Sequence, residues 1–182
     1  MAIYSKHPQI KKKTVSIKGE RMNNTCIYSD MIINEDTVRV YNIHLASNWF
    51  KNTDYSFIQN PQKEKIKEGI IGITKRMKSS FIKRAEEVEI IKQHMAECTY
   101  PIIVCGDFND TPLSYAYNSI KGDLSDAFSI SGKGIGDSFV KIPALRIDYI
   151  LHDNELKSSN YQKHKQVLSD HYAVSCEIEI GN

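Results

Sequence analysis

A carboxylate and a carboxamide lie two residues apart at the end of a short apolar segment of this sequence. Residues 102–105 are apolar and mostly β-branched, as a buried strand requires, and Gly106 then allows a tight turn before Asp107 and Asn109. In an extended chain, residues i and i+2 project from the same face, so both side chains point into one space beyond the strand. Asp107 can deprotonate or orient a water molecule, and Asn109 can donate hydrogen bonds to an oxyanion without adding charge.

Two acidic groups lie beside other strand-like segments. Asp148 interrupts the apolar residues 145–151, where a buried carboxylate needs a partner such as arginine, histidine, a metal ion or a backbone donor. Asp170 and His171 directly precede another predicted strand. The Asp170 carboxylate suits Mg²⁺ or Mn²⁺, and the His171 imidazole can donate a hydrogen bond or a proton to a phosphoryl oxygen. Asp148 is then the natural group to hold the tautomer of His171.

A fourth strand, predicted over residues 37–45, ends in the pair Asn42 and His44. A single histidine at a strand end is often structural, so His44 is the weakest of these candidates. Asp170 and His171 also have a structural alternative, as a surface turn that begins a strand. Because four apolar strands each carry Asp, Asn or His near one end, we expect these side chains to form one site.

Asp107 and Asn109 have a structural alternative as well. They could form an Asx turn that caps the helix predicted over residues 112–120. Asp110 or Thr111 is the better cap, because these two residues directly precede the proline at the start of that helix. Since the cap is already supplied, we favour a functional role for Asp107 and Asn109.

The composition indicates one soluble globular domain over residues 1–182, with 41% hydrophobic and 25% charged residues. A net charge of +2 gives no overall electrostatic preference for nucleic acid or membranes, so a nucleic-acid-binding module is the least favoured class. The lysine- and arginine-rich residues 63–84 form either a solvated helix surface or a basic rim that attracts a phosphate-bearing substrate. The glycine-rich residues 131–137 lack the spacing of a phosphate-binding loop.

The four cysteines show no zinc-binding spacing, and three lie in or beside apolar strands, which favours reduced core thiols. No apolar run of about 18 residues is present, so no segment is expected to span a membrane. A cytoplasmic location is the default expectation, with a membrane-anchored or exported parent protein as the alternatives.

The pattern of apolar residues predicts more strands than helices and therefore an α/β sandwich. Residues 34–36 form a polar turn between two strands, which predicts a hairpin. In residues 79–98, apolar side chains such as Phe81 recur at helical spacing, Glu87 faces water, and one of the first two serines is the cap. Strands are predicted at residues 2–5, 14–17, 25–33, 37–45, 102–105, 137–141, 146–152 and 172–180, helices at 62–78, 79–98 and 112–120, and a loop at 47–61.

Four motifs together resemble the endonuclease/exonuclease/phosphatase superfamily, the deoxyribonuclease-like metal-dependent phosphoesterases. They are Asn42-Ile43-His44-Leu45, Gly106-Asp107-Phe108-Asn109-Asp110, Arg146-Ile147-Asp148-Tyr149-Ile150-Leu151 and Ser169-Asp170-His171. Their order and approximate spacing match over nearly the whole chain. The resemblance implies a four-layer α/β/β/α sandwich, with an active site between the sheet edges that hydrolyses phosphoesters with Mg²⁺ or Mn²⁺.

The resemblance also implies roles for the candidate residues. Asp107 would activate the attacking water, and Asn109 would hold a phosphate oxygen. Asp148 would orient His171, which would stabilise the pentacoordinate phosphorane, and Asp170 would help to bind the metal. The expected partner is a phosphoester substrate, either nucleic acid or another phosphodiester.

His44 resembles the family histidine that assists the leaving group. The superfamily pattern normally begins with further strands and a glutamate that is the principal metal ligand, and none of the early acids, from Glu20 to Asp36, lies in that context. The chain therefore resembles the C-terminal two-thirds of a domain truncated at its N-terminus, and we expect a partial sandwich with impaired metal binding. Its exposed strand edges predict self-association. The alternative to a phosphodiesterase or nuclease is a catalytically silent fragment that folds and binds phosphate ligands only.

Overall fold

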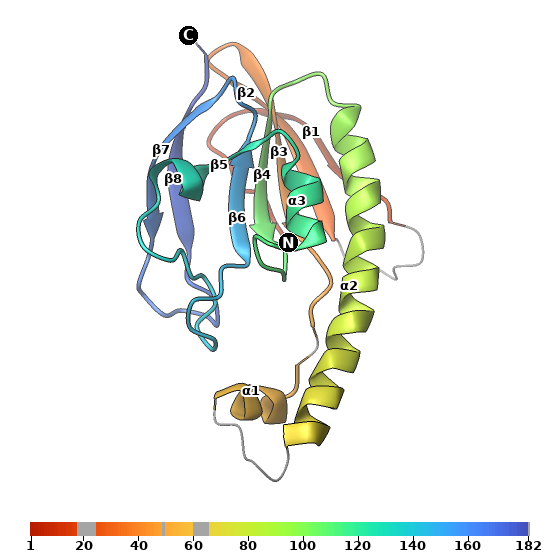
Figure 1. The fold of residues 1–182 in the computed structure, drawn as a ribbon. Helices are drawn as coiled ribbons and strands as arrows, with labels where there is room; N and C mark the ends of the chain where they lie inside the picture. The colour runs from red at the N-terminus through yellow and green to blue at the C-terminus, as the bar shows by residue number, and fades with distance from the viewer. Residues whose placement is uncertain (18–24, 49, 60–65, 182) are drawn as a thin grey trace.

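Two β-sheets pack face to face, and helices cover the outer face of the larger sheet (Figure 1). The computed structural model describes residues 1–17, 25–48, 50–59 and 66–181. The larger sheet contains β1 (Gln9–Thr14), β2 (Cys26–Ile33), β3 (Asp36–His44), β4 (Ile102–Asp107), β5 (Ser125–Asp126) and β6 (Asp148–His152), in the order β1-β2-β3-β4-β6-β5. The smaller sheet pairs β7 (Lys157–Lys163) with β8 (Val174–Glu179), and the helices are α1 (Asn52–Gln59), α2 (Ile66–Ala96), α3 (Tyr115–Lys121) and α4 (Ala127–Ser131).

The strand directions bring three strand ends to one edge of the larger sheet. β2 and β3 form the predicted hairpin, and its turn residues Asn34 and Glu35 have φ values of 50° and 74°, as a type I′ turn requires. β3 and β4 are parallel and joined by a long connection that contains α2, so their carboxyl ends lie together. β6 is antiparallel to β4, which places its first residue at the same edge.

The hydrophobic core lies on both faces of the larger sheet. On one face, Val88 of α2 packs in a cluster with Tyr41 and Val104. On the other face, Ile103 packs in a cluster with Ile178 of the smaller sheet. Because successive residues of a strand point to opposite faces, the neighbours Ile103 and Val104 belong to different parts of the core. These helix, sheet and sheet layers confirm the predicted partial α/β sandwich.

The first two predicted strands are wrong. Residues 2–5 and 15–17 lie outside any strand, and β1 occupies Gln9–Thr14 between them. β1 is an edge strand with mostly exposed residues, so it lacks the apolar pattern that marks a buried strand. Its three consecutive exposed lysines, residues 11–13, disfavour pairing with another strand edge. The structure therefore gives the predicted self-association no support.

The prediction of two helices after the loop at residues 47–61 is also wrong. α2 continues through the predicted break at residue 79, and the hydroxyl of Ser80 donates a hydrogen bond to the Ser47 carbonyl (2.8 Å) instead of capping a helix. The predicted loop contains α1. Residues 60–65, where the first predicted helix begins, lie outside the described residues.

Several polar side chains of α2 are buried rather than solvated. Glu87 was expected to face water, but its carboxylate accepts the Ala46 N–H at 2.8 Å. Arg84 is buried and donates to the Asp110 carboxylate (3.0 Å) and the Ala46 carbonyl (2.7 Å), so it cannot contribute to a basic rim. Asp110 is consequently not the cap of α3, whose N-cap is Ser114.

The C-terminal half differs from the prediction in its irregular parts. The strand expected at residues 137–141 is reduced to one bridge between Phe139 and His171. β5, α4 and β7 were missed, and in β7 only Ser158 and Tyr161 are buried, so the alternating signal is weak. All four cysteines are free thiols, as expected. Within the described residues, no helix combines the length and apolarity needed to cross a membrane.

Gly106 lets β3 and β4 approach closely where the strands end. Its φ is +146°, and a Cβ atom at this position would lie 1.9 Å from the Ile43 carbonyl oxygen. Any larger residue must therefore displace β3 or β4, as well as adopt a backbone conformation that side chains disfavour.

We expect Gly106→Ala to lower the free energy of unfolding by about 3 kcal/mol or more, because steric overlap adds to backbone strain. Gly134→Ala is the matched control, since Gly134 also has a positive φ (+77°) but no heavy atom lies within 4 Å of the added Cβ. The control should cost only about 1 kcal/mol. Urea unfolding followed by circular dichroism measures both values, and equal losses would contradict the steric explanation.

Candidate active site

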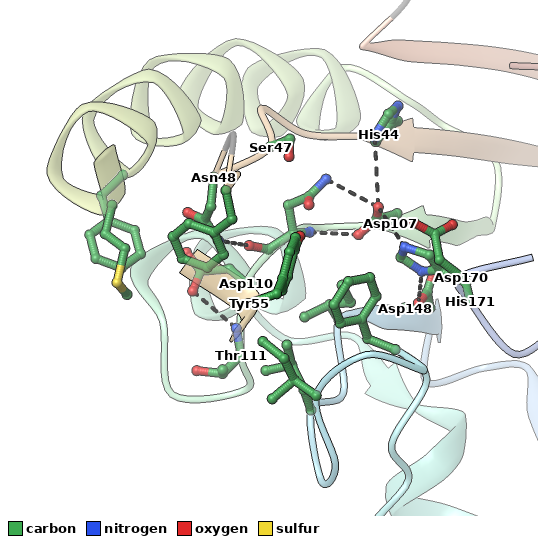
Figure 2. A pocket seen from close by; sticks show the side chains of 18 of the residues that line it. His44, Ser47, Asn48, Tyr55, Asp107, Asp110, Thr111, Asp148, Asp170 and His171 are labelled. Carbon is green, nitrogen blue, oxygen red and sulfur yellow. Dashed lines mark hydrogen bonds and ion pairs between the residues drawn. The ribbon is translucent and has the colours of Figure 1, made fainter. Parts of the chain in front are cut away.

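The ends of β3, β4 and β6 place three of the predicted site residues beside one another (Figure 2). In the strand register, His44 is opposite Asp107, and Asp107 is opposite Asp148. Side chains directly opposite one another on neighbouring strands have Cβ atoms about 4.5–5.5 Å apart. The pairing of the strands therefore brings these three side chains together without any special loop.

Asn109 holds the Asp107 carboxylate on two sides. The backbone N–H of Asn109 donates to Asp107 Oδ1 at 2.8 Å, and its side-chain Nδ2 donates to Asp107 Oδ2 at 3.1 Å. Nδ2 also donates to the Leu45 carbonyl at 3.0 Å. Asn109 adopts a left-handed conformation with φ of 52°, which asparagine tolerates better than most residues. The Asx turn considered from the sequence is thus present, but it holds Asp107 and does not cap a helix.

His171 is held between the two aspartates. Its Nδ1 lies 2.8 Å from Asp148 Oδ2, and its Nε2 lies 3.9 Å from Asp107 Oδ2. The ring of Phe139 packs edge-on against the imidazole with centroids 5.1 Å apart. The buried Ser138 hydroxyl accepts the Asp148 backbone N–H at 3.0 Å, which fixes the start of β6. Asp148 therefore sets the orientation of His171, and Nε2 is directed towards Asp107.

Burial and neighbouring charges shift the pKa values of Asp107 and His171. Burial, followed by the charge of Asp148, raises the pKa of the Asp107 carboxyl to about 6, although the Asn109 backbone and the two nearby imidazoles act in the opposite direction. The hydrogen bond to Asp148 is the largest cause that raises the pKa of His171, while partial burial opposes it. Both groups consequently take up protons more readily in the folded protein than in the unfolded chain.

His44 and Asp170 lie at the border of this group. The side chain of His44 is 56% exposed, and its Nε2 lies 3.7 Å from Asp107 Oδ2. Asp170 is also half-exposed, and its carboxylate lies 3.6 Å from Lys141 Nζ. Slight burial would raise the pKa of Asp170, but hydrogen bonds and the charges of His171 and Lys141 outweigh it and lower the pKa. Asp170 thus borders the site without joining the contacts among His171, Asp148 and Asp107.

A metal ion fits the donor atoms of the site in part. One ligand atom from each of Asp107, Asp148 and His171 can be chosen so that all three lie within 4.8 Å of one another. Two carboxylates suit Mg²⁺ or Mn²⁺, and a cation there would relieve the mutual repulsion that raises the pKa of Asp107. Among the early acids, Asp30 is buried in an ion pair with Arg39 (2.6 Å), so it is not available as a ligand.

The site opens into a cavity of about 910 Å³. Its polar end consists of the strand-end residues and His171, and its other end is apolar and formed by α1, α2 and the loop before β6 (Figure 2). Phe81, expected in the core, instead lines this cavity and is 42% exposed. A group of carboxylates and imidazoles at the strand ends therefore adjoins an apolar pocket.

The sequence matches the family model described as Endonuclease/Exonuclease/phosphatase family over residues 1–171. The chain belongs to this family. The match confirms the resemblance predicted from the four motifs, and the family comprises phosphoesterases and nucleases. The chain has no significant match among curated protein sequences.

Solved structures of the endonuclease/exonuclease/phosphatase fold superpose on most of the chain. The human nocturnin catalytic domain with bound sulfate superposes with a TM-score of 0.61 at 15% identity, over 94% of this chain and 59% of that domain. A family protein from Bacteroides vulgatus superposes with a TM-score of 0.64 at 15% identity, over 96% of this chain and 67% of that protein. Humanized D. rerio TDP2 superposes with a TM-score of 0.60 at 12% identity, over 94% of this chain and 67% of that protein. At these identities the likeness establishes the fold alone, and the chain spans about 59% of the nocturnin domain.

Two residues that support the site were not identified from the sequence. Ser138 and Phe139 lie in a segment that was interpreted as a strand, yet they fix Asp148 and His171 through a hydrogen bond and a ring contact. The only available signal was that a short apolar pair follows the glycine-rich loop. This signal does not identify a contact with a residue that is more than thirty positions away.

We expect Asp107→Asn to stabilise the metal-free protein at pH 8 by roughly 2 kcal/mol, because it removes a buried charge that repels Asp148. A carboxyl whose pKa is raised in the folded state lowers stability as pH rises from its unfolded pKa towards about 6. The gain should therefore vanish below about pH 4, where Asp107 is neutral in both states. Urea unfolding in the presence of EDTA measures it, and a gain that is equal at pH 4 and pH 8 would disprove the electrostatic origin.

We expect Asp148→Asn to lower the pKa of His171, because it removes the largest cause that raises this pKa. The measurement is an NMR titration of the imidazole ring protons. Glu155→Gln is the control, since it removes an exposed carboxylate beyond the other end of β6 and should leave the His171 titration unchanged. An unchanged pKa in Asp148→Asn would show that the hydrogen bond does not control His171.

Proposed function

We propose that this chain hydrolyses phosphoesters in a reaction that depends on a divalent metal, with phosphodiesters preferred to phosphomonoesters. The observation that carries the proposal is the arrangement of Asp107 between two imidazoles, with His171 bound in turn to Asp148 (2.8 Å). This arrangement combines a base, an oriented imidazole and a third group that holds it. Family membership supports the same class of reaction.

Asp107 is the proposed base that orients and deprotonates the attacking water. A pKa of about 6 is suited to this role, because a base works best when its pKa is close to the working pH. Both side-chain protons of Asn109 are already donated, to Leu45 and to Asp107. Asn109 therefore positions Asp107 in this arrangement, and it would have to exchange one of these bonds to hold a phosphate oxygen.

His171 is the proposed donor to the phosphoryl group. With Nδ1 bound to Asp148, the ring presents Nε2 towards Asp107 and the cavity, and the raised pKa favours the charged form that stabilises negative charge on phosphoryl oxygens. His44, exposed on the other side of Asp107, is the proposed proton donor to the leaving group. When bound, Mg²⁺ or Mn²⁺ would polarise the phosphoryl oxygen, and the carboxylates that would hold it are Asp107 and Asp148, with Asp170 at the border of the site as a further candidate.

A second candidate is a protein that binds phosphate ligands without turnover. The observation in its favour is that Asp30 is buried with Arg39 and Glu35 lies in the hairpin turn, while Glu20 lies outside the described residues. No glutamate of the described residues therefore joins Asp107, Asp148 and His171. Metal affinity would then be too low to support hydrolysis.

The test is hydrolysis of bis(4-nitrophenyl) phosphate by the protein with Mn²⁺ or Mg²⁺. Activity should be abolished by EDTA, and Asp107→Asn and His171→Asn should each lower kcat/KM by about 10²- to 10⁴-fold. The monoester 4-nitrophenyl phosphate should give a lower kcat/KM than the diester. Glu155→Gln, far from the site, should retain full activity. Phosphate binding without turnover would instead support the second candidate.

A further inference from the structure

The cavity beside the site has two chemically different halves. The polar half contains Asp107, Asp148 and His171, and the other half is formed by apolar side chains of α1, of the residues just before it and of α2. The apolar half is lined by Phe50, Tyr55, Ile58, Ile73, Met77 and Phe81. Its volume together with the polar half, about 910 Å³, matches that of pockets which enclose a small organic molecule. A bound phosphoryl group would therefore have an apolar surface next to it.

The apolar half is built by α1 and the projecting end of α2. α2 extends beyond the sheet, and α1 lies beside its projecting end (Figure 1). An ion pair between Asp54 of α1 and Arg76 of α2 joins the two helices. On the inner side, rings run in sequence from α1 to the site, with Tyr55 and Phe139 at 6.0 Å and Phe139 and His171 at 5.1 Å. An apolar wall thus leads directly to the imidazole.

The charges around the cavity disfavour a polynucleotide. No lysine or arginine is found among the described residues that line it, whereas four aspartates do so. Lys141 interacts with Asp170 (3.6 Å) and with the ring of Tyr55. A nucleic-acid chain carries one negative charge per nucleotide, and proteins bind it with cations along its path. One phosphoryl group, in contrast, can be neutralised by His171 and a metal ion.

We infer that the substrate is a phosphoester in which a single phosphoryl group carries an uncharged apolar group of organic-molecule size, and that Met77 and Phe81 help to determine this specificity. The inference rests on the proposed function for the polar half of the same cavity. It adds the chemical class of the substrate, which the polar residues leave open.

The test compares two diesters that differ only in the apolar group, methyl 4-nitrophenyl phosphate and hexyl 4-nitrophenyl phosphate. In both, water adds to phosphorus and the bond from phosphorus to the aryl oxygen breaks. The leaving group is 4-nitrophenolate, and the other product is the alkyl phosphate. With Mn²⁺ present, kcat/KM should be at least about tenfold higher for the hexyl ester, which is the effect of about two buried methylene groups. Calorimetry should show the same tenfold preference in binding hexyl phosphate over methyl phosphate.

Met77→Gln has a similar shape but places a polar amide in the apolar half, and it should reduce both preferences to less than about threefold. Phe81→Gln should do the same, and because Phe81 is partly exposed this variant should fold. Ile82→Gln is the control, since Ile82 is 54% exposed and lies outside the cavity lining. It should keep the full preference. Thermal melting of each variant verifies that the fold is retained.

The outcomes separate the two proposals. Turnover without a hexyl preference overturns this inference and leaves the proposed function intact. Binding that prefers hexyl phosphate, without turnover of either ester, supports the inference while the proposed function fails. A higher kcat/KM for a single-stranded oligonucleotide than for the hexyl ester overturns the inference. So does a dimer that Met77→Gln dissociates, because the apolar half would then be an interface between two copies.

Discussion

Two carboxylates, those of Asp107 and Asp148, are directly opposite each other across β4 and β6, and the remaining site residues compensate for this repulsion. Asn109 donates two hydrogen bonds to Asp107, and His171 forms a hydrogen bond with Asp148 while its other nitrogen faces Asp107. Such a pair is unfavourable for folding when it lacks a cation or a proton. Burial, followed by the charge of Asp148, accordingly raises the pKa of Asp107 to about 6. The same charge makes the position suitable for a base and for a metal ion. Stability is thus lower at the place where the proposed chemistry occurs.

The sheet supplies the precision that this arrangement needs. Strand register fixes the relative positions of His44, Asp107 and Asp148, and Gly106 allows β3 and β4 to approach closely just before the site. Asp110 also lines the cavity but does not join the contacts among Asp107, Asp148 and His171, and its buried pair with Arg84 ties the loop after β4 to α2. Catalytic groups on strand ends with a supporting set of buried polar contacts are held more firmly than groups on loops.

The helical arm formed by α1 and the projecting end of α2 has a different role from the sheet. Its apolar side chains remain accessible because they face the cavity rather than another layer of the sandwich. Apolar residues at helical spacing are predicted to lie in the core, as Phe81 was, because the periodicity of a sequence does not reveal what a helix face contacts. The site and the apolar pocket are therefore contributed by different parts of the fold, and only the site is encoded by short motifs.

The amino-acid sequence was sufficient to predict the central strands, the α/β sandwich, the family and the residues that meet at the strand ends. These features depend on local patterns, namely short apolar runs that end in Gly, Asp, Asn or His. The contact of Asp148 with His171 was expected from the sequence, whereas the pairing of Asp170 with Lys141 emerged only from the tertiary structure. The tertiary structure also decided that α2 is continuous, that Arg84 and Glu87 are buried, and that β7 is a strand. Contacts between residues distant in the chain determine these outcomes. Local periodicity predicts that a polar side chain or a polar strand is exposed to solvent, but a distant partner can form its hydrogen bonds and bury it.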